Sequence, residues 1–164
     1  MMTVSDLARK NITIGLVLFV IVGFITASIM AKKQDQAFQT DQELYKLVVQ
    51  QLQEGNYGIV LAGTSTLEHS QRSSEAVNYT IGLAAANAGE LEKGILHMQR
   101  ALDINPHKVE DPMFMLQFAE ALVLAGKNKE AGLVLERSKS FAAPESFPHY
   151  QERVTQLQEE IGDI

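Results

Sequence analysis

The stretch IGLAAANAGELEKGILHMQRALDINP, residues 81–106, decides how this chain folds. Its apolar residues follow the three- to four-residue spacing of an amphipathic helix, but Gly89 interrupts that pattern and Pro106 closes it. Glycine commonly occupies the left-handed position that ends a helix, and proline cannot continue one. The stretch is therefore predicted to form two helices with a turn at Gly89 and Glu90.

A similar turn recurs on both sides of this stretch. The segments EGNY, AGEL and AGKN contain Gly55, Gly89 and Gly126, which are separated by 34 and then 37 residues. Each glycine follows one apolar helical pattern and precedes another. Repeated units of this length bury their apolar faces by stacking on their neighbours. The chain beyond residue 40 is therefore predicted to be a row of helix pairs.

The middle copy, residues 75–108, resembles a tetratricopeptide repeat (TPR) when its first position is placed at Glu75. The copy at 112–145 resembles one too, and the copy at 41–74 is degenerate. Three inserted residues, 109–111, are expected to lengthen the loop between copies. The residues that match the family's structural positions are Gly82, Gly89, Gly94, Met98, Ala101, Pro106, Ala119, Gly126 and Ala131. The resemblance implies an all-α fold with a short TPR-like α-solenoid of three helix pairs.

Residues 146–164 are predicted to form a C-terminal capping helix. Ser146 is the expected N-cap, and Pro148 lies in the expected first turn. Apolar residues then recur every three or four positions from Tyr150 to Ile161, while polar residues occupy the other face. Such a helix covers the apolar face that the last pair would otherwise expose.

Residues 12–31 contain no charged side chain and are predicted to be an N-terminal single transmembrane helix. At about 1.5 Å per residue this segment covers ~30 Å, the thickness of the hydrocarbon core of a bilayer. Basic pairs at Arg9–Lys10 and Lys32–Lys33 flank it and would lie at the headgroups. An N-terminal tail, 1–11, and a juxtamembrane linker, 32–40, complete this part of the chain.

Two alternatives for this segment stay open. A signal peptide cleaved near Ser28 is the alternative to a retained span, which the length of the apolar run favours. The short basic tail favours an N-in, C-out orientation, with a cytoplasmic TPR domain as the alternative. Gly23, Ala27 and Ala31 recur every four residues and would let another membrane helix pack closely against the span.

The composition argues against several classes of function. The chain has no cysteine, which removes thiolate metal sites and cysteine nucleophiles, and its net charge of −6 argues against a nucleic-acid surface. No pair of histidines has metal-binding helical spacing, and no glycine-rich phosphate loop follows a strand. We therefore expect no enzymatic activity, no cofactor, no metal site and no small-molecule substrate.

The TPR resemblance implies a partner-binding groove on the first helix of each pair. This face is aromatic, aliphatic and amide-bearing, with almost no charge. Groove positions fall on Tyr45, Val49, Tyr79, Leu83, Asn87, Leu116 and Glu120. TPR domains that clamp a carboxylate use Lys, Arg and Asn, and only Asn87 is of this kind here. The expected ligand is therefore an apolar segment or an amphipathic helix, unless the protein's own helices fill this face.

An anchor followed by such a domain resembles several families of anchored TPR proteins. These include an ancillary subunit of the Sec translocon, cytochrome c maturation factors and photosystem assembly factors. The resemblance implies a non-catalytic membrane adaptor that binds protein partners to assemble, recruit or stabilise a membrane complex. The alternatives are a stoichiometric accessory subunit of a large membrane complex and an extracytoplasmic chaperone-like TPR protein.

Overall fold

The computed structural model describes residues 28, 30, 42–65 and 74–162. Apart from Ser28 and Met30, the predicted tail, membrane span and linker lie outside these residues, as do the three small residues expected to pack the span. Within the described part of the chain, no helix is both long and apolar enough to cross a bilayer. Residues Glu43–Ile164 form one compact unit.

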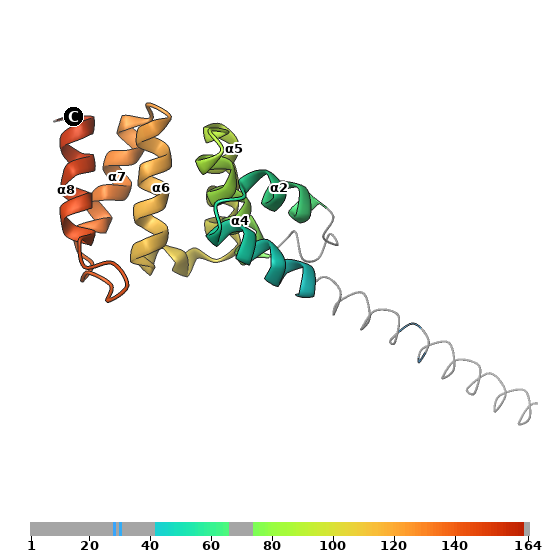
Figure 1. Cartoon of the computed structure of the whole chain (residues 1–164). Helices are drawn as coiled ribbons and strands as arrows, with labels where there is room; N and C mark the ends of the chain where they lie inside the picture. The colour runs from blue at the N-terminus through green and yellow to red at the C-terminus, as the bar shows by residue number, and fades with distance from the viewer. Residues whose placement is uncertain (1–27, 29, 31–41, 66–73, 163–164) are drawn as a thin grey trace, which may run out of the picture. The chain divides into compact units, whose positions relative to one another are not determined.

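The described residues are helical and contain no strand, so the predicted all-α class is confirmed (Figure 1). In chain order the helices are residues 42–53, α2 (Tyr57–Ser65), α4 (Glu75–Asn87), α5 (Leu91–Ile104), the 3-10 helix η1 (Pro106–Glu110), α6 (Pro112–Leu124), α7 (Asn128–Ser138) and α8 (Tyr150–Ile161).

Tight glycine turns join the two helices of each pair. Gly55, Gly89 and Gly126 have φ angles of +77°, +83° and +71°. In this left-handed region a residue with a Cβ atom is strained by about 1–2 kcal/mol, whereas glycine is unstrained. α4 therefore ends at Asn87 and α5 begins at Leu91, and the two-helix prediction for residues 81–106 is confirmed.

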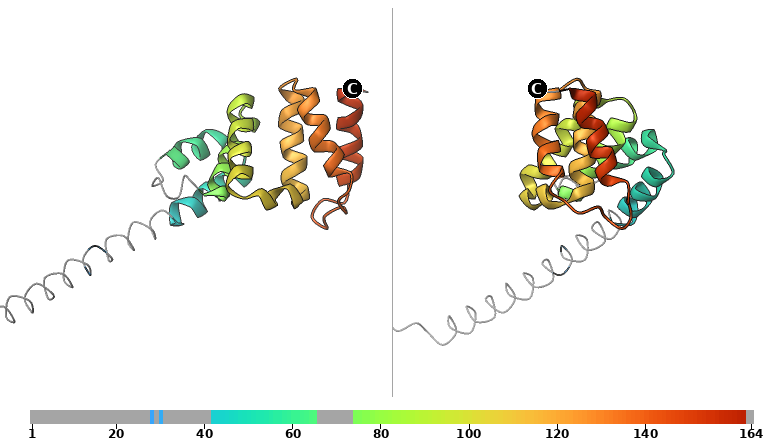
Figure 2. Two further views of the ribbon diagram at one scale, coloured as in Figure 1. Left: turned by 180° about the vertical axis from the view of Figure 1, so that it is seen from behind. Right: turned by 90° about the vertical axis from the view of Figure 1, so that its left-hand side faces the viewer.

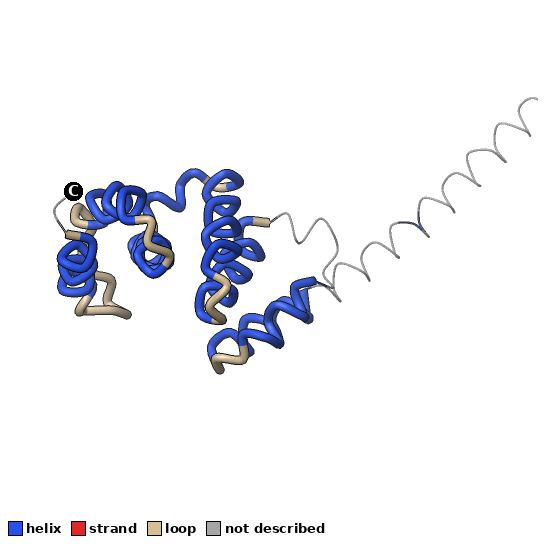
Figure 3. Tube along the Cα trace, turned by 90° about the horizontal axis from the view of Figure 1, so that it is seen from above, coloured by secondary structure: helices blue, strands red, loops and turns tan. Residues whose placement is uncertain are grey.

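The helices pack as successive pairs in chain order. α4 packs against α5 and α6 against α7, while α2 contacts α4, α5 contacts α6, and α8 contacts both α6 and α7. The left view of Figure 2 shows α6, α7 and α8 side by side, and Figure 3 shows the helices following one another along the unit. One buried cluster around Phe114 joins the second pair to the third, and another around Tyr150 joins α6 and α7 to α8.

Side-chain caps fix where two of these helices begin. The Ser74 side chain accepts a hydrogen bond from the Val77 backbone N–H at the start of α4. At the start of α6 the Asp111 carboxylate accepts from the backbone N–H groups of Met113 and Phe114, each at 3.1 Å. These bonds satisfy donors that have no partner inside the helix.

The inserted residues before α6 are more regular than the predicted loop. Pro106 follows the end of α5 and opens the 3-10 helix η1, which runs to Glu110. The Asn105 side chain accepts a hydrogen bond from the His107 backbone N–H at 3.2 Å, which caps η1. The connection between the second and third pairs is thereby fixed by local hydrogen bonds.

The predicted start of the capping helix is wrong. α8 begins at Tyr150, with His149 and not Ser146 at its N-cap position. Before it the chain makes successive turns, in which the Phe147 N–H donates to Pro144 and the Tyr150 N–H donates to Phe147. A proline disfavours the helical conformation of the residue before it. Because Phe147 precedes Pro148, a helix does not continue from Ser146 through this point.

α7 ends earlier than the repeat pattern indicates. Its last residue is Ser138, well before residue 145, where the third copy was predicted to end. Ser138 is fully buried, and its hydroxyl donates to the Val134 carbonyl at 2.9 Å. The chain then turns so that Phe141 packs against both buried clusters, which accounts for the early end.

Candidate protein-binding groove

A depression of about 330 Å³ lies between the second and third helix pairs. Its wall is mainly aliphatic, with two amides and one carboxylate. It is lined by Leu83, Ala86, Asn87, Met98, Gln117, Glu120, Ala121 and Leu124, which belong to α4, α5 and α6. We call this depression the groove.

A second depression continues the groove past the Gly89 turn. Both are lined by Leu124, whose side chain is 69% exposed. The charged side chains around the second depression are paired, because Lys93 contacts Glu90 at 2.8 Å and Lys127 contacts Glu92 at 2.7 Å. The exposed apolar surface at Leu124 is thus bordered by ion pairs that leave no excess charge.

The polar groups of the groove are partly engaged by the protein itself. The Glu120 carboxylate accepts a hydrogen bond from Arg153 Nε of α8 at 2.7 Å. Asn87 Nδ2 donates to the Leu83 carbonyl at 2.8 Å, and Gln117 Oε1 accepts from the Tyr79 hydroxyl. The only charge lining the groove is therefore neutralised, and the two amides each keep one side for another partner.

Tyr79 forms a rigid support for Gln117. Its ring lies 5.1 Å from the ring of Phe114, at a tilted angle of 49°. The Lys108 ammonium lies 5.1 Å from the centre of the Tyr79 ring and 5.8 Å from that of Phe114, within the range of a cation–π contact. The contacts of the ring with Phe114 and Lys108 fix where the Tyr79 hydroxyl holds Gln117.

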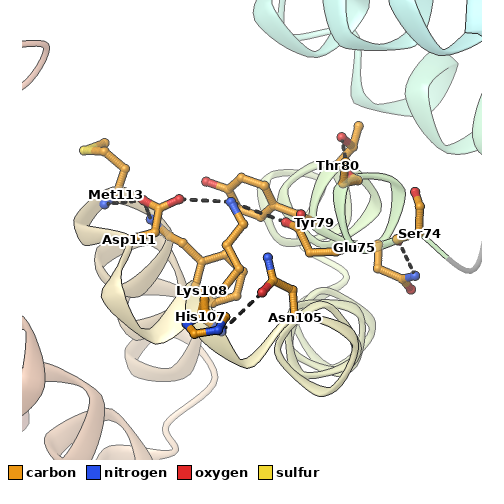
Figure 4. A network of polar contacts seen from close by, with 12 residues as sticks. Ser74, Glu75, Tyr79, Thr80, Asn105, His107, Lys108, Asp111 and Met113 are labelled. Atoms are coloured by element: carbon orange, nitrogen blue, oxygen red, sulfur yellow. Dashed lines mark hydrogen bonds and ion pairs between the residues drawn. The ribbon is translucent and has the colours of Figure 1, made fainter.

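Lys108 in turn is held between two carboxylates (Figure 4). Its Nζ atom lies 3.0 Å from Asp111 Oδ2 and 3.3 Å from the buried Oε1 atom of Glu75. Burial alone would lower the pKa of Lys108, but the hydrogen bond and charge of Asp111, together with Glu75, outweigh burial and raise that pKa. The side chain is thus kept charged, and it links η1 to the first turns of α4 and α6.

Three of the residues predicted to line a groove lie together in this one. Leu83, Asn87 and Glu120 all contribute to its wall. Val49 is half-buried on the first helix of the degenerate pair and does not reach it.

The other three predicted residues lie in contacts between the first helices of neighbouring pairs, or between α6 and α8. The Tyr45 hydroxyl is 3.2 Å from the Thr80 hydroxyl, and Tyr79 packs on Phe114. Leu116 is only 2% exposed, in the same buried cluster as Tyr150 and Val154 of α8. The prediction that Leu116 lines an open groove is therefore wrong, because α8 covers that part of the face.

Sequence reasoning missed Gln117, Arg153 and the support from Lys108. Gln117 could have been found, because it lies one helical turn before Glu120 and shares its face of α6. The Arg153–Glu120 and Lys108–Glu75 pairs join residues that are far apart in the sequence, so no local pattern indicates them. His97 is half-buried, with its Nδ1 atom 3.0 Å from Asn78 Oδ1.

The lining of the groove is that of a binding surface. Among the residues that the structure describes, no group of three or more His, Asp or Glu side chains is placed to hold a metal ion. The groove offers an aliphatic surface with amide groups, the combination that takes up an apolar peptide segment. No protein-family model matches this chain, and no curated protein sequence matches it significantly.

Proposed function

We propose that this chain is a non-catalytic, membrane-anchored adaptor of the TPR type, whose groove binds an apolar segment of a partner protein. The glycine turns and the buried small residues where α4 crosses α5 support the TPR assignment. The uncharged run at residues 12–31 supports the anchor. The partner is then a protein of a membrane complex that the adaptor helps to assemble, recruit or stabilise.

The groove itself is the observation that carries this proposal. Its lining is aliphatic, its carboxylate is already paired with Arg153, and the exposed Leu124 extends the apolar surface to the rim. An exposed leucine of this size at the edge of a groove gains free energy when a partner covers it. α8 closes the neighbouring face at Leu116, so the groove at Leu83 is the part of this surface that is accessible.

Site-specific photo-cross-linking in the native membrane tests the proposal. A photoreactive phenylalanine analogue is placed at Leu124, and a matched control places it at Leu133 of α7. The two leucines have similar exposure, at 69% and 76%, but Leu133 does not line the groove. We expect a defined protein adduct from position 124 that is absent from position 133.

Leu124→Asn should abolish the function if the proposal holds. Because Leu124 is exposed, this change leaves the buried clusters intact, and Leu133→Asn is its control. We expect the first variant, and not the second, to lose the partner that cross-linking identifies, measured by its co-purification with the chain in detergent. A partner retained by Leu124→Asn and lost by Leu133→Asn would move the binding site to the α7–α8 face.

A further inference from the structure

The hydrogen-bonding groups left open in the groove point to the conformation of its ligand. We propose that the groove binds an extended, uncharged apolar segment through that segment's backbone amide and does not accept a helix. This inference rests on the proposed function and adds to it which conformation the partner presents. Gln117 and Asn87 would be the residues that determine this specificity.

Gln117 supplies a hydrogen-bond donor. The Tyr79 hydroxyl donates to its Oε1 atom, so the carbonyl end of the amide is directed at Tyr79. Its Nε2 group makes no hydrogen bond to any residue that the structure describes. Because Phe114 and Lys108 hold the Tyr79 ring, Tyr79 acts as a positioning residue that keeps the N–H groups of Gln117 available.

Asn87 supplies a hydrogen-bond acceptor from the opposite wall. Its Nδ2 group donates to the Leu83 carbonyl one turn earlier in α4, which fixes the direction of the amide. Its Oδ1 atom accepts no hydrogen bond from the described residues. The groove therefore carries a donor on α6 and an acceptor on α4, with aliphatic side chains between them.

A donor and an acceptor on facing walls match one peptide unit of an extended chain. In an extended segment the C=O of one residue and the N–H of the next belong to the same trans peptide and point to opposite sides, and so toward opposite walls. Inside a helix both groups are already bonded to residues four positions away. A helix would leave Gln117 and Asn87 covered without partners, which costs free energy, whereas an extended segment satisfies both.

The apolar and charged surroundings set the rest of the ligand's chemistry. The lining between the two amides is made by Leu83, Ala86, Ala121 and Leu124, which favours small and medium aliphatic side chains. The one carboxylate is already paired with Arg153. An acidic or basic ligand side chain would therefore find no free counter-charge in the groove, so the segment is uncharged where it is bound.

The test uses linear peptides as probes of the full chain in detergent micelles. Peptides of about 12 residues are selected from a random phage library, and those that bind Leu124→Asn at least tenfold more weakly are kept as groove ligands. Each is then synthesised in two further forms, one with single backbone N-methylations and one stapled as a helix. Dissociation constants are measured by fluorescence anisotropy.

We expect one N-methylated position to weaken binding by about tenfold, the loss of roughly one backbone hydrogen bond. The stapled form should bind at least tenfold more weakly than the linear peptide. Asn87→Ala should weaken the linear peptide by a similar factor but leave the affinity for the critical N-methylated form unchanged, because the same bond is already missing.

Gln117→Glu gives a second, independent readout. A glutamate can still accept the Tyr79 hydroxyl, but it presents an anionic acceptor where the donor was. We expect about tenfold weaker binding, with a thermal melt that is unchanged. Leu133→Asn, which lies outside the groove, should bind every peptide as the unmodified chain does.

Two results would overturn the inference in different ways. If the groove ligands bind best when stapled and tolerate every N-methylation, the groove takes a helix, and the adaptor proposal survives. If no selected peptide is weakened by Leu124→Asn, the groove is not a ligand site, and both proposals fail.

Discussion

Gly82 and Gly94 lie against each other where α4 crosses α5. A Cβ atom on Gly94 would lie 3.0 Å from the Gly82 carbonyl oxygen and 2.9 Å from the Ala86 backbone nitrogen. A Cβ on Gly82 would lie 2.7 Å from Met98 Cγ. Both glycines are thus required by the closeness of two backbones, and not by an unusual φ angle.

Replacing Gly94 with alanine should destabilise the folded unit. The new methyl group meets backbone atoms of α4, so the helices must separate, at a cost of about 1–3 kcal/mol in the free energy of unfolding. Gly58→Ala is the matched control, because a Cβ on this exposed α2 glycine meets nothing within 4 Å. That change should stabilise the unit by up to ~1 kcal/mol through helix propensity. Urea unfolding followed by circular dichroism measures both, and equal midpoints would contradict the close crossing.

Asp111→Ala should cost more stability than Ser146→Ala. Asp111 caps α6 and pairs with Lys108, so its loss should lower the free energy of unfolding by about 1–2 kcal/mol. Ser146 is exposed and caps no helix, so Ser146→Ala should change stability by less than ~0.5 kcal/mol. Thermal melts of the two variants give the comparison, and a comparable loss with Ser146→Ala would show that α8 begins earlier.

The folded unit should lose stability at alkaline pH. Burial, with the charges of Asp111 and Glu75, raises the pKa of Tyr79 above its ordinary value of 10.0, and the pKa of Lys108 is raised as well. A raised folded-state pKa means that the unfolded chain releases the proton first. Stability is therefore complete below the unfolded pKa and falls as the pH rises above it, by about 1.4 kcal/mol per pH unit and group.

Urea midpoints at pH 9, 10 and 11 measure this effect. Tyr79→Phe keeps the ring but has no phenolic proton, so its midpoint should fall less steeply above pH 10. A slope that is the same in Tyr79→Phe and the unmodified chain would show that Tyr79 contributes nothing to the pH dependence.

A smaller loss of stability is expected in mild acid through His97. Burial, with the nearby charges of Arg100 and Lys93, lowers the pKa of His97 below 6.5. The unfolded chain then takes up the proton first, so stability is complete above about pH 6.5 and declines as the pH falls toward the folded-state pKa. Melting temperatures between pH 7.5 and 5.5 report this change. His97→Gln cannot titrate, and an identical acid decline in this variant would exclude His97 as its source.

The helix pairs were predictable because their requirements are local. A glycine in a left-handed turn and a small residue at a helix crossing are both set by the size of one side chain. Gly89 and Gly94 therefore reveal their roles in the sequence, as does Ala101, which is fully buried on the second helix of the same pair. The early end of α7 at Ser138 escaped prediction because it depends on where Phe141 packs.

The groove was predictable only in part, because an open face and a covered face have the same pattern in one sequence. Tyr45, Tyr79 and Leu116 occupy equivalent places in the three pairs, and each meets the first helix of the following pair or, after the third pair, α8. Whether such a residue is free for a ligand depends on how closely that next helix approaches. The residues of α8 and of η1 do not indicate in the sequence how closely the neighbouring helix packs.

The two oxygens of Asp111 have consequences for how the unit melts. Oδ1 closes the first turn of α6, while Oδ2 holds Lys108, which also contacts Glu75 at the start of α4. The same side chain thus nucleates one helix and fastens it to the preceding pair. In a linear array this strengthens the coupling between neighbours relative to the stability of each alone. The second and third pairs should therefore exchange their amide hydrogens in one cooperative opening, and fray together or not at all.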